Sequence, residues 1–164
     1  MEIKDSGTRR EFPSGAVRDS ADGRGRCDLL PLHEVAELIC YKYCKTECAL
    51  YFIDDFIRNG QWGALNRALV EFIHERGWDA ATAMLEVSIH FSDGCAKYGE
   101  RNWEKGIPAH CYIDSAVRHY LKWVRSDDDE PHDRAFLWNI LCLLWTLRNH
   151  PECNDLWENY DGDG

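Results

Sequence analysis

The sequence HDRAFLWNILCLLWTLR, residues 132–148, decides the fold. A helix drawn through it is apolar on almost every face, and such a helix is expected at the centre of a bundle. Pro131 directly precedes it and suits the first turn of a helix, where its missing N–H is not needed. Asn139 is the polar exception, and a buried amide costs free energy unless it is hydrogen-bonded. The sequence therefore predicts a central helix and a specific partner for Asn139.

Amphipathic patterns extend outward from this helix towards the N-terminus. Apolar residues recur with helical period over about 29–44, 49–57, 62–74, 79–91 and 114–124. We find no β alternation of useful length and no internal repeat. The predicted fold class is therefore all-α, a helical bundle of about five or six helices.

Three segments are expected along the chain. Residues 1–26 are rich in Gly, Ser, Arg and Asp and predict a flexible arm, residues 27–150 a helical catalytic domain, and residues 151–164 an acidic tail. Arg18, Arg24 and Arg26 lie in the arm. Such an arm is either a disordered leader or a strap that closes over an anion with bidentate arginine contacts.

Charge and hydropathy exclude some classes of partner. The formal net charge is −10, which argues against DNA, RNA or an anionic membrane surface as a partner. No apolar window is long enough for a membrane span, and residues 1–10 lack a signal-peptide apolar region. We therefore expect a cytoplasmic protein. A small anionic ligand remains compatible with this charge, because a local basic pocket or a bound metal reverses the local field.

Residues 97–119 combine cations, amides and an aromatic side chain in a short span. Lys97, Lys105 and Arg118 are candidates for a phosphate clamp, and ordinary surface ion pairs are the alternative. Asn102 can read a base edge. Trp103 either stacks on a base or plugs one end of the bundle.

Acidic residues flank this span on both sides. Four carboxylates are candidate ligands of a hard divalent cation, with solvated surface pairs as the alternative: Glu86, Asp114, Glu130 and Asp133. His132-Asp133 is also an HD dipeptide, which binds metal in HD-type phosphohydrolases.

Five blocks of sequence carry a resemblance to a known family: residues 12–19, 23–31, 94–106, 114–119 and 129–139. In letters the third and fifth read GCAKYGERNWEKG and DEPHDRAFLWN. They resemble the dATP/dGTP diphosphohydrolase N-terminal-type family, a MazG-like group of phage and bacterial nucleotide pyrophosphohydrolases that includes the MazZ enzymes. Against shorter members, about residues 45–78 look like an insertion. Glu130 and Asp133 can stand for the ExxD motif of MazG proteins. The helical EExxE motif is absent, and Glu86 with His90 and Asp93 is its nearest substitute.

The resemblance implies a metal-dependent enzyme that converts dGTP or dATP to the monophosphate and pyrophosphate. The implied cofactor is a divalent metal, Mg²⁺ first and Mn²⁺ or Co²⁺ otherwise. The resemblance also implies a purine deoxynucleoside triphosphate as partner, allows a homo-oligomer, and places a phage-encoded chain in the host cytoplasm. The alternatives are a non-catalytic nucleotide- or protein-binding phage accessory protein and an HD-type triphosphohydrolase, which would release triphosphate.

Under this interpretation the candidate residues take three roles. His119 serves as proton shuttle and Glu130 as catalytic carboxylate. The metal ligands are Glu86, Asp114, Glu130 and Asp133. The substrate-binding residues are Arg18, Arg24, Arg26, Lys97, Asn102, Trp103, Lys105, Arg118 and Asn139.

Overall fold

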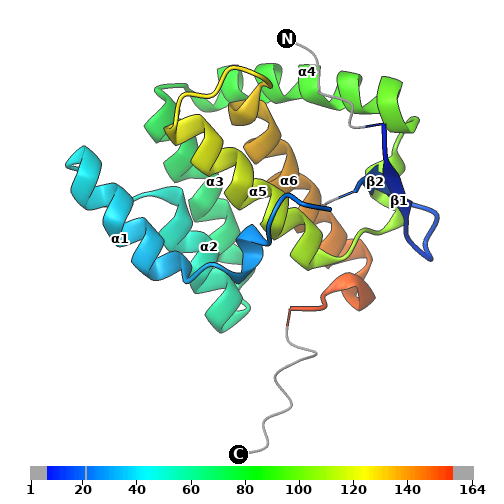
Figure 1. The fold of residues 1–164 in the computed structure, drawn as a ribbon, viewed down its shortest axis with the longest axis horizontal. Coiled ribbons are helices and arrows are strands. Elements are labelled where there is room, and N and C mark those ends of the chain that lie inside the picture. Colours follow the sequence, from blue (N-terminus) through cyan, green and yellow to red (C-terminus); the bar gives the residue numbers. More distant parts are fainter. Residues whose placement is uncertain (1–6, 21, 157–164) are drawn as a thin grey trace, which may run out of the picture.

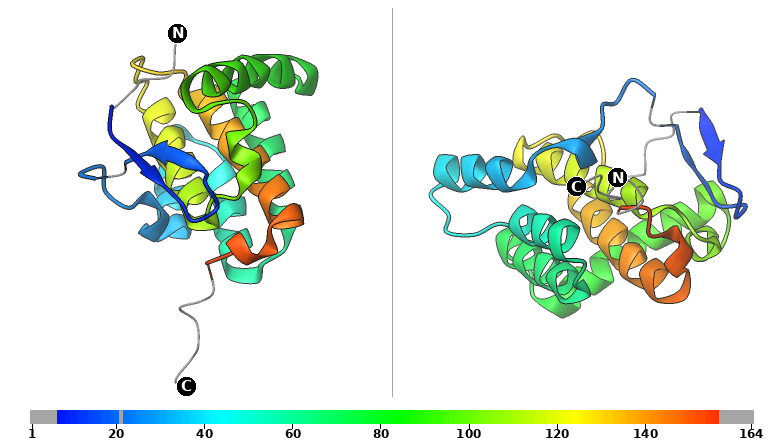
Figure 2. Two further views of the ribbon diagram at one scale, coloured as in Figure 1. Left: turned by 90° about the vertical axis from the view of Figure 1, so that its right-hand side faces the viewer. Right: turned by 90° about the horizontal axis from the view of Figure 1, so that it is seen from below.

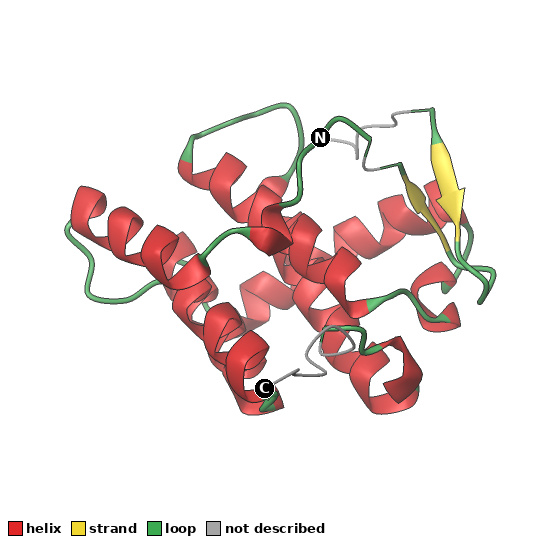
Figure 3. Cartoon of the chain, turned by 60° about the horizontal axis from the view of Figure 1, so that its bottom comes forward, coloured by secondary structure: helices red, strands yellow, loops and turns green. Residues whose placement is uncertain are grey.

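The computed structural model describes residues 7–20 and 22–156 (Figure 1). Its helices and strands are β1 (Arg9–Glu11), β2 (Val17–Asp19), η1 (Cys27–Leu29), α1 (Leu32–Tyr43), α2 (Ala49–Asn59), α3 (Trp62–Arg76), α4 (Ala80–Tyr98), η2 (Asn102–Lys105), α5 (Ala109–Val124), α6 (His132–Asn149) and η3 (Pro151–Cys153). Apart from the short hairpin, all regular structure in these residues is helical (Figure 3). The all-α prediction is confirmed.

Two helices form the centre of the bundle. α5 and α6 lie side by side along most of their length, and α2 pairs with α3 on one flank (Figures 1 and 2). α1 packs on α2, whereas α4 crosses the other side of α6. α6 buries ten of its residues, whereas Trp138, Leu141 and Leu144 are only partly buried, so this helix is central as predicted but not enclosed on every face. No helix in the described part of the chain is both long and apolar enough to span a bilayer.

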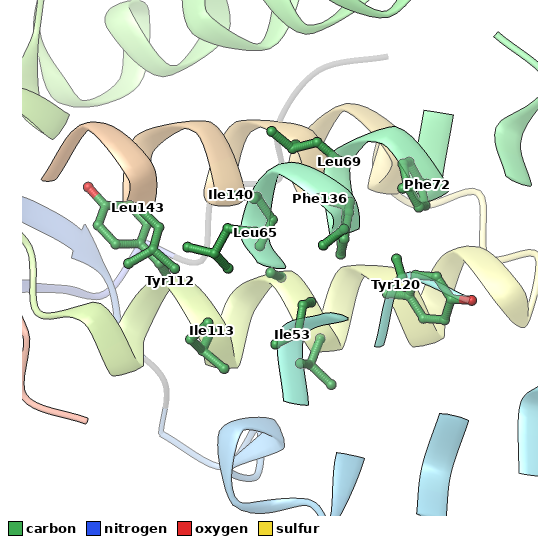
Figure 4. Close-up of a cluster of buried hydrophobic side chains, with 14 of the residues drawn as sticks. Ile53, Leu65, Leu69, Phe72, Tyr112, Ile113, Tyr120, Phe136, Ile140 and Leu143 are labelled. Atoms are coloured by element: carbon green, nitrogen blue, oxygen red, sulfur yellow. The ribbon is translucent and has the colours of Figure 1, made fainter. Parts of the chain in front are cut away.

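Aromatic rings hold the helices together at one end of the core (Figure 4). Phe72 of α3 packs against Phe136 of α6, with ring centroids 4.3 Å apart. Tyr120 of α5 lies 6.0 Å from Phe72 and 5.8 Å from Phe136. All three rings are fully buried. This contact joins the α2–α3 pair to the central helices.

Residues 45–78 belong to this core. Phe56 of α2 and Phe72 of α3 are fully buried, and α3 ends at Gly77, whose φ of 75° suits a residue without Cβ. The next helix, α4, is capped by Asp79, which accepts a hydrogen bond from the backbone N–H of Thr82 at 2.9 Å. The segment that resembled an insertion therefore contributes two helices to the single hydrophobic core.

Residues 9–19 of the predicted arm contain two short strands that the sequence pattern did not indicate. β1 and β2 form an antiparallel hairpin in which Arg10 pairs with Arg18. Strands of three residues are too short to show an alternating pattern. Side-chain contacts from the helical domain hold the hairpin: the Asn102 amide accepts from the Val17 N–H and donates to the Val17 carbonyl, both at 2.8 Å.

The start of the acidic tail is docked on α5. Asp155 bonds the Nδ1 of His110 and accepts from the backbone N–H of the same residue at 3.0 Å. The predicted tail beyond residue 156 lies outside the described residues. The hydrogen bond that His110 donates to Asp155, with a smaller contribution from Cys111, raises the pKa of His110 to about 10.

This contact predicts a pH-dependent stability. A histidine whose pKa is raised on folding contributes stability in full below its unfolded pKa of about 6.5, and the contribution is lost as pH rises through about 10. We expect the difference in unfolding temperature between wild type and His110→Gln to shrink between pH 6.5 and 10. Thermal unfolding followed by circular dichroism across this range measures it. Substitution of exposed His74 by Gln is the control, and a difference independent of pH would contradict the prediction.

Candidate active site

A cleft of about 100 Å³ opens between the hairpin and helices α4, α5 and α6. Because about 10–15 Å³ of such space accommodates a water molecule, the cleft has room for several waters or for a phosphate-sized group at its floor. Its polar lining comes from elements far apart in the sequence: Arg10, Arg18, Asp19 and Arg24 from the N-terminal segment, His90 and Tyr98 from α4, Asn102 from η2, Asp114, Ser115, Arg118 and His119 from α5, and Glu130, Trp138 and Asn139 from the C-terminal part.

Unpartnered nitrogen atoms gather in this cleft. Seven buried side-chain nitrogen or oxygen atoms in the described residues have no hydrogen-bond partner, and five of them belong to residues that line the cleft. The five are Arg10 Nε, Arg18 Nη1, His90 Nδ1, Arg118 Nε and Trp138 Nε1. A buried donor without an acceptor is costly, so such a cluster is typical of a site that binds an acceptor-rich ligand. Three of these five atoms belong to arginines, so the cleft offers cationic donors although the net charge of the chain is −10.

Hydrogen bonds from one nitrogen of its guanidinium group, Nη2, hold the side chain of Arg18 in place. Its Nη2 donates to Ser115 Oγ at 3.0 Å and to Asn139 Oδ1 at 2.9 Å. The guanidinium also lies over the rings of Tyr112 and Trp138, 5.1 and 5.7 Å from their centroids. Nη1 is left available to a ligand. These contacts identify Arg18 as the partner that the sequence predicted for Asn139, whose own amide donates to Ala135 O at 2.8 Å.

A second arginine is oriented by a carboxylate. Nη2 of Arg118 contacts both oxygens of Asp114, at 2.7 and 2.8 Å, and donates to Gly25 O at 2.9 Å. Asp114 also accepts from the backbone N–H of Cys27 at 2.7 Å. The carboxylate of Asp114 is therefore occupied as a support for Arg118 and for the chain that follows the hairpin. Nε of Arg118 remains without a partner in the cleft.

Asp19 joins the hairpin to the end of α4. It accepts hydrogen bonds from Lys97 Nζ and Tyr98 Oη, both at 2.8 Å, and Arg24 lies 3.9 Å away. Burial alone would raise the pKa of Asp19, but these donors and the charge of Lys97 lower it overall. The carboxylate is thus ionised at neutral pH and holds β2 against α4.

Three possible metal ligands converge beside the cleft, which two of them, His119 and Glu130, also line. One ligand atom each from His119, Glu130 and His132 lies within 4.8 Å of the others. Nδ1 of His119 is 2.9 Å from Nδ1 of His132. Burial, and next the proximity of His132, lower the pKa of His119 well below its usual value. His119 is therefore neutral at physiological pH and has a lone pair to offer.

Asp129 fixes the orientation of His132. Its carboxylate contacts Nε2 of His132 at 2.8 Å, and this hydrogen bond lowers the pKa of Asp129 to about 2. An ionised carboxylate can only accept, so Nε2 of His132 donates to Asp129, and the other ring nitrogen, Nδ1, faces His119. A carboxylate behind an imidazole is the usual support of a metal-binding histidine.

The comparison with family models agrees with this architecture. The model of the N-terminal domain of dATP/dGTP diphosphohydrolases matches residues 66–156, more than half of the chain. The chain belongs to the dATP/dGTP diphosphohydrolase N-terminal family. Searches of curated proteins and of solved structures found no match. The domain is therefore of a nucleotide-hydrolase type, and its matched region includes residues 66–78 of the segment that resembled an insertion.

Two of the metal ligands expected from the sequence, Glu86 and Asp133, are not part of the donor set of His119, Glu130 and His132. Glu86 is paired with Arg134, which donates to it at 2.5 and 2.9 Å. Asp133 accepts from Arg76 Nε at 2.8 Å. Glu130 alone of the four predicted carboxylates belongs to the donor set with His119 and His132. Neighbouring arginines neutralise Glu86 and Asp133, a tertiary effect that residue spacing does not reveal.

The predicted substrate-binding residues divide into two groups. Arg18, Arg24, Asn102, Arg118 and Asn139 line the cleft. Lys97, Trp103, Lys105 and Arg26 are not among its lining residues. Lys97 contacts Asp19, and Arg26 is an exposed partner of Asp28.

Trp103 and Asn102 have structural contacts instead of the expected base contacts. The Trp103 ring packs edge-on against Phe91 and Trp145, with centroids 5.5 and 5.0 Å apart, so it plugs the end of the bundle. Both sides of the Asn102 amide are used by Val17. Lys105 is exposed at the end of η2.

Two residues of the cleft, Arg10 and Trp138, were not recognised as site residues in the sequence, and His90 was noticed only as a neighbour of Glu86 in the substitute for the EExxE motif. Trp138 occupies a helix whose apolar pattern hides it among core positions. Arg10 resembles any other charge in a polar segment. His132 was noticed only within the HD dipeptide, and its position beside His119 depends on the packing of α5 against α6.

Proposed function

We propose that this protein is a divalent-metal-dependent hydrolase that converts a purine deoxynucleoside triphosphate, dGTP or dATP, to the monophosphate and pyrophosphate. The observation that carries the proposal is the position of the unpartnered donors of Arg10, Arg18 and Arg118 in the same cleft as His119 and Glu130. A cationic donor cluster suits a polyphosphate, and the adjacent donor set suits a metal. The family match supports the nucleotide class of the substrate.

The donor set favours a particular kind of metal. His119, Glu130 and His132 would supply two imidazole nitrogens and a carboxylate oxygen. Mg²⁺ prefers oxygen ligands, whereas later divalent ions accept imidazole readily. We therefore propose Mn²⁺ or Co²⁺ as a better fit than the Mg²⁺ expected first. When bound, such an ion neutralises phosphate charge and lowers the pKa of a bound water.

The protein's own side chains position the substrate. Arg18 and Arg118 are held by neutral or anionic partners on one side and offer free N–H groups on the other, so their geometry is set before a phosphate arrives. Arg24 lies near the cleft mouth and adds charge. Glu130 lines the same cleft, where its carboxylate can accept a proton from a water aligned with the α-phosphorus. Attack there breaks the bond to the α–β bridging oxygen and releases pyrophosphate.

The HD-type alternative has less support, because Asp133 contacts Arg76 and lies outside the donor set that contains His132.

Identification of the reaction products separates the alternatives. The purified protein is incubated with each of the four common deoxynucleoside triphosphates and Mn²⁺, Co²⁺, Mg²⁺ or EDTA, and products are resolved by anion-exchange chromatography.

We expect the purine substrates to give monophosphate and pyrophosphate with Mn²⁺ or Co²⁺, and no product with EDTA. Release of triphosphate would support the HD-type reaction. Binding of a nucleotide without turnover under any metal would show a non-catalytic binding protein, and equal rates in EDTA would remove the metal from the mechanism.

A further inference from the structure

The wall of the cleft between α4 and α6 carries two hydrogen-bonding side chains without charge. His90 of α4 is 7% exposed, and its Nδ1 has no partner in the described residues. The buried Nε1–H of Trp138, on α6, is equally unpartnered there. The centroids of the two rings are 5.9 Å apart, so one ligand can contact both. The remaining buried unpartnered atoms of the cleft belong to arginines.

These two residues differ in what they offer a ligand. Burial, together with the charge of Arg134, lowers the pKa of His90 to about 4; Asp133 acts weakly in the opposite direction and Lys97 in the same one. His90 is therefore neutral at physiological pH and presents an N–H on one ring nitrogen and a lone pair on the other, in either tautomer. The indole of Trp138 can only donate.

The surroundings of this pair suit a flat ring. Trp138 lies within an aromatic cluster, 6.0 Å from Phe91 and 6.1 Å from Tyr112 between ring centroids. Tyr98 and Ala135 add apolar surface to the cleft lining. Arg18 lies next to this pair, 5.7 Å from the centroid of the Trp138 ring. Since the arginines match the phosphates, the uncharged hydrogen-bonding groups of His90 and Trp138 are the part of the cleft that matches the base.

We propose that His90 and Trp138 read the edge of a purine base that carries N7 and the C6 substituent, an inference that rests on the function proposed above. Trp138 Nε1–H donates to N7, an acceptor in both adenine and guanine. The C6 substituent is a carbonyl acceptor in guanine and an amino donor in adenine. His90 meets either one by the choice of tautomer. Pyrimidines have no N7, so this pair selects purines and admits both of them.

Removal of N7 tests the contact directly. Steady-state kcat and KM are measured with dGTP and 7-deaza-dGTP, in which a C–H replaces N7, for wild type and Trp138→Phe. We expect the loss of N7 to raise the wild-type KM about tenfold and to leave kcat within about twofold, the size expected for one hydrogen bond. Trp138→Phe should raise the KM for dGTP by a similar factor and show no further loss with 7-deaza-dGTP.

Control variants test whether the effect on KM comes from the contacts of Trp138 and His90 with the base. Trp145→Phe makes the same chemical change away from the cleft, next to Trp103, and should keep the wild-type response to N7. His90→Gln, whose amide offers a donor and an acceptor, should hydrolyse both purine substrates, whereas His90→Leu should raise the KM of both about tenfold.

An equal effect of 7-deaza substitution on wild type and Trp138→Phe would overturn the inference while leaving the hydrolase function intact. A wild-type protein that hydrolyses no nucleotide would instead overturn the proposed function, and this inference with it.

Discussion

Substitution of Glu130 by glutamine is expected to lower kcat/KM for dGTP by about 10³-fold, because a metal ligand stabilises transition-state charge by several kcal/mol. The change keeps the size of the side chain and removes the negative charge from the set formed with His119 and His132. Affinity for Mn²⁺, measured by isothermal titration calorimetry, should fall in parallel. The two readouts together separate a metal ligand from a residue that only binds nucleotide.

Asp128→Asn is the matched control for this variant. Asp128 is exposed in the same acidic loop, and the substitution changes the net charge by the same amount. It should leave turnover within about twofold, because screened surface charges contribute little. If Glu130→Gln kept both wild-type turnover and wild-type Mn²⁺ affinity, the metal would have to be placed elsewhere in the cleft.

Substitution of Phe136 by alanine is expected to destabilise the fold by about 3–5 kcal/mol. Phe136 is fully buried, and its ring joins Phe72 of α3 to Tyr120 of α5 (Figure 4). Alanine would leave a cavity where three helices meet, and rigid neighbouring rings cannot close it. Urea unfolding followed by tryptophan fluorescence measures the loss as a lower midpoint at constant slope.

Val70→Ala serves as the comparison for the core variant. Val70 lies on α3, 68% exposed, so its truncation removes little buried surface. Its effect should stay within about 0.5 kcal/mol. Equal stability of Phe136→Ala and wild type would mean that the ring contact with Phe72 does not hold α3 on the central helices.

The helical core was predictable because its signal is local. The apolar run of residues 132–148 covers almost every face of a helix, and ten residues of α6 are buried. The capping side chain of Asp79 and the break at Gly77 likewise depend on a few adjacent residues. The hairpin at residues 9–19 had no such local signal, since its two strands are held by the distant Asn102 and by the partners of Asp19.

The sequence predicted several residues of the candidate site, but it did not predict which partner each charged residue contacts. Arginines of the arm, Arg118 and Glu130 were recognised as chemistry-bearing residues, and the cleft includes Arg18, Arg24, Arg118 and Glu130. Their partners came only from the fold: Arg134 occupies Glu86 and Arg76 occupies Asp133. Charge spacing along a helix shows which residues are acidic, but it does not show which cation from another helix neutralises them.

By itself, the sequence determined an all-α chain with a central apolar helix and the family to which its blocks belong. The tertiary structure alone decided which polar atoms are left without a partner. Donors of Arg10 and His90 lie 80 residues apart in the chain and line one cleft because the hairpin and α4 both pack beside α5 and α6. The helical pattern of apolar residues depends on positions a few residues apart in the chain, so the sequence shows it. Whether a buried polar atom has a hydrogen-bond partner depends on which distant groups the fold brings next to it, so only the tertiary structure shows it.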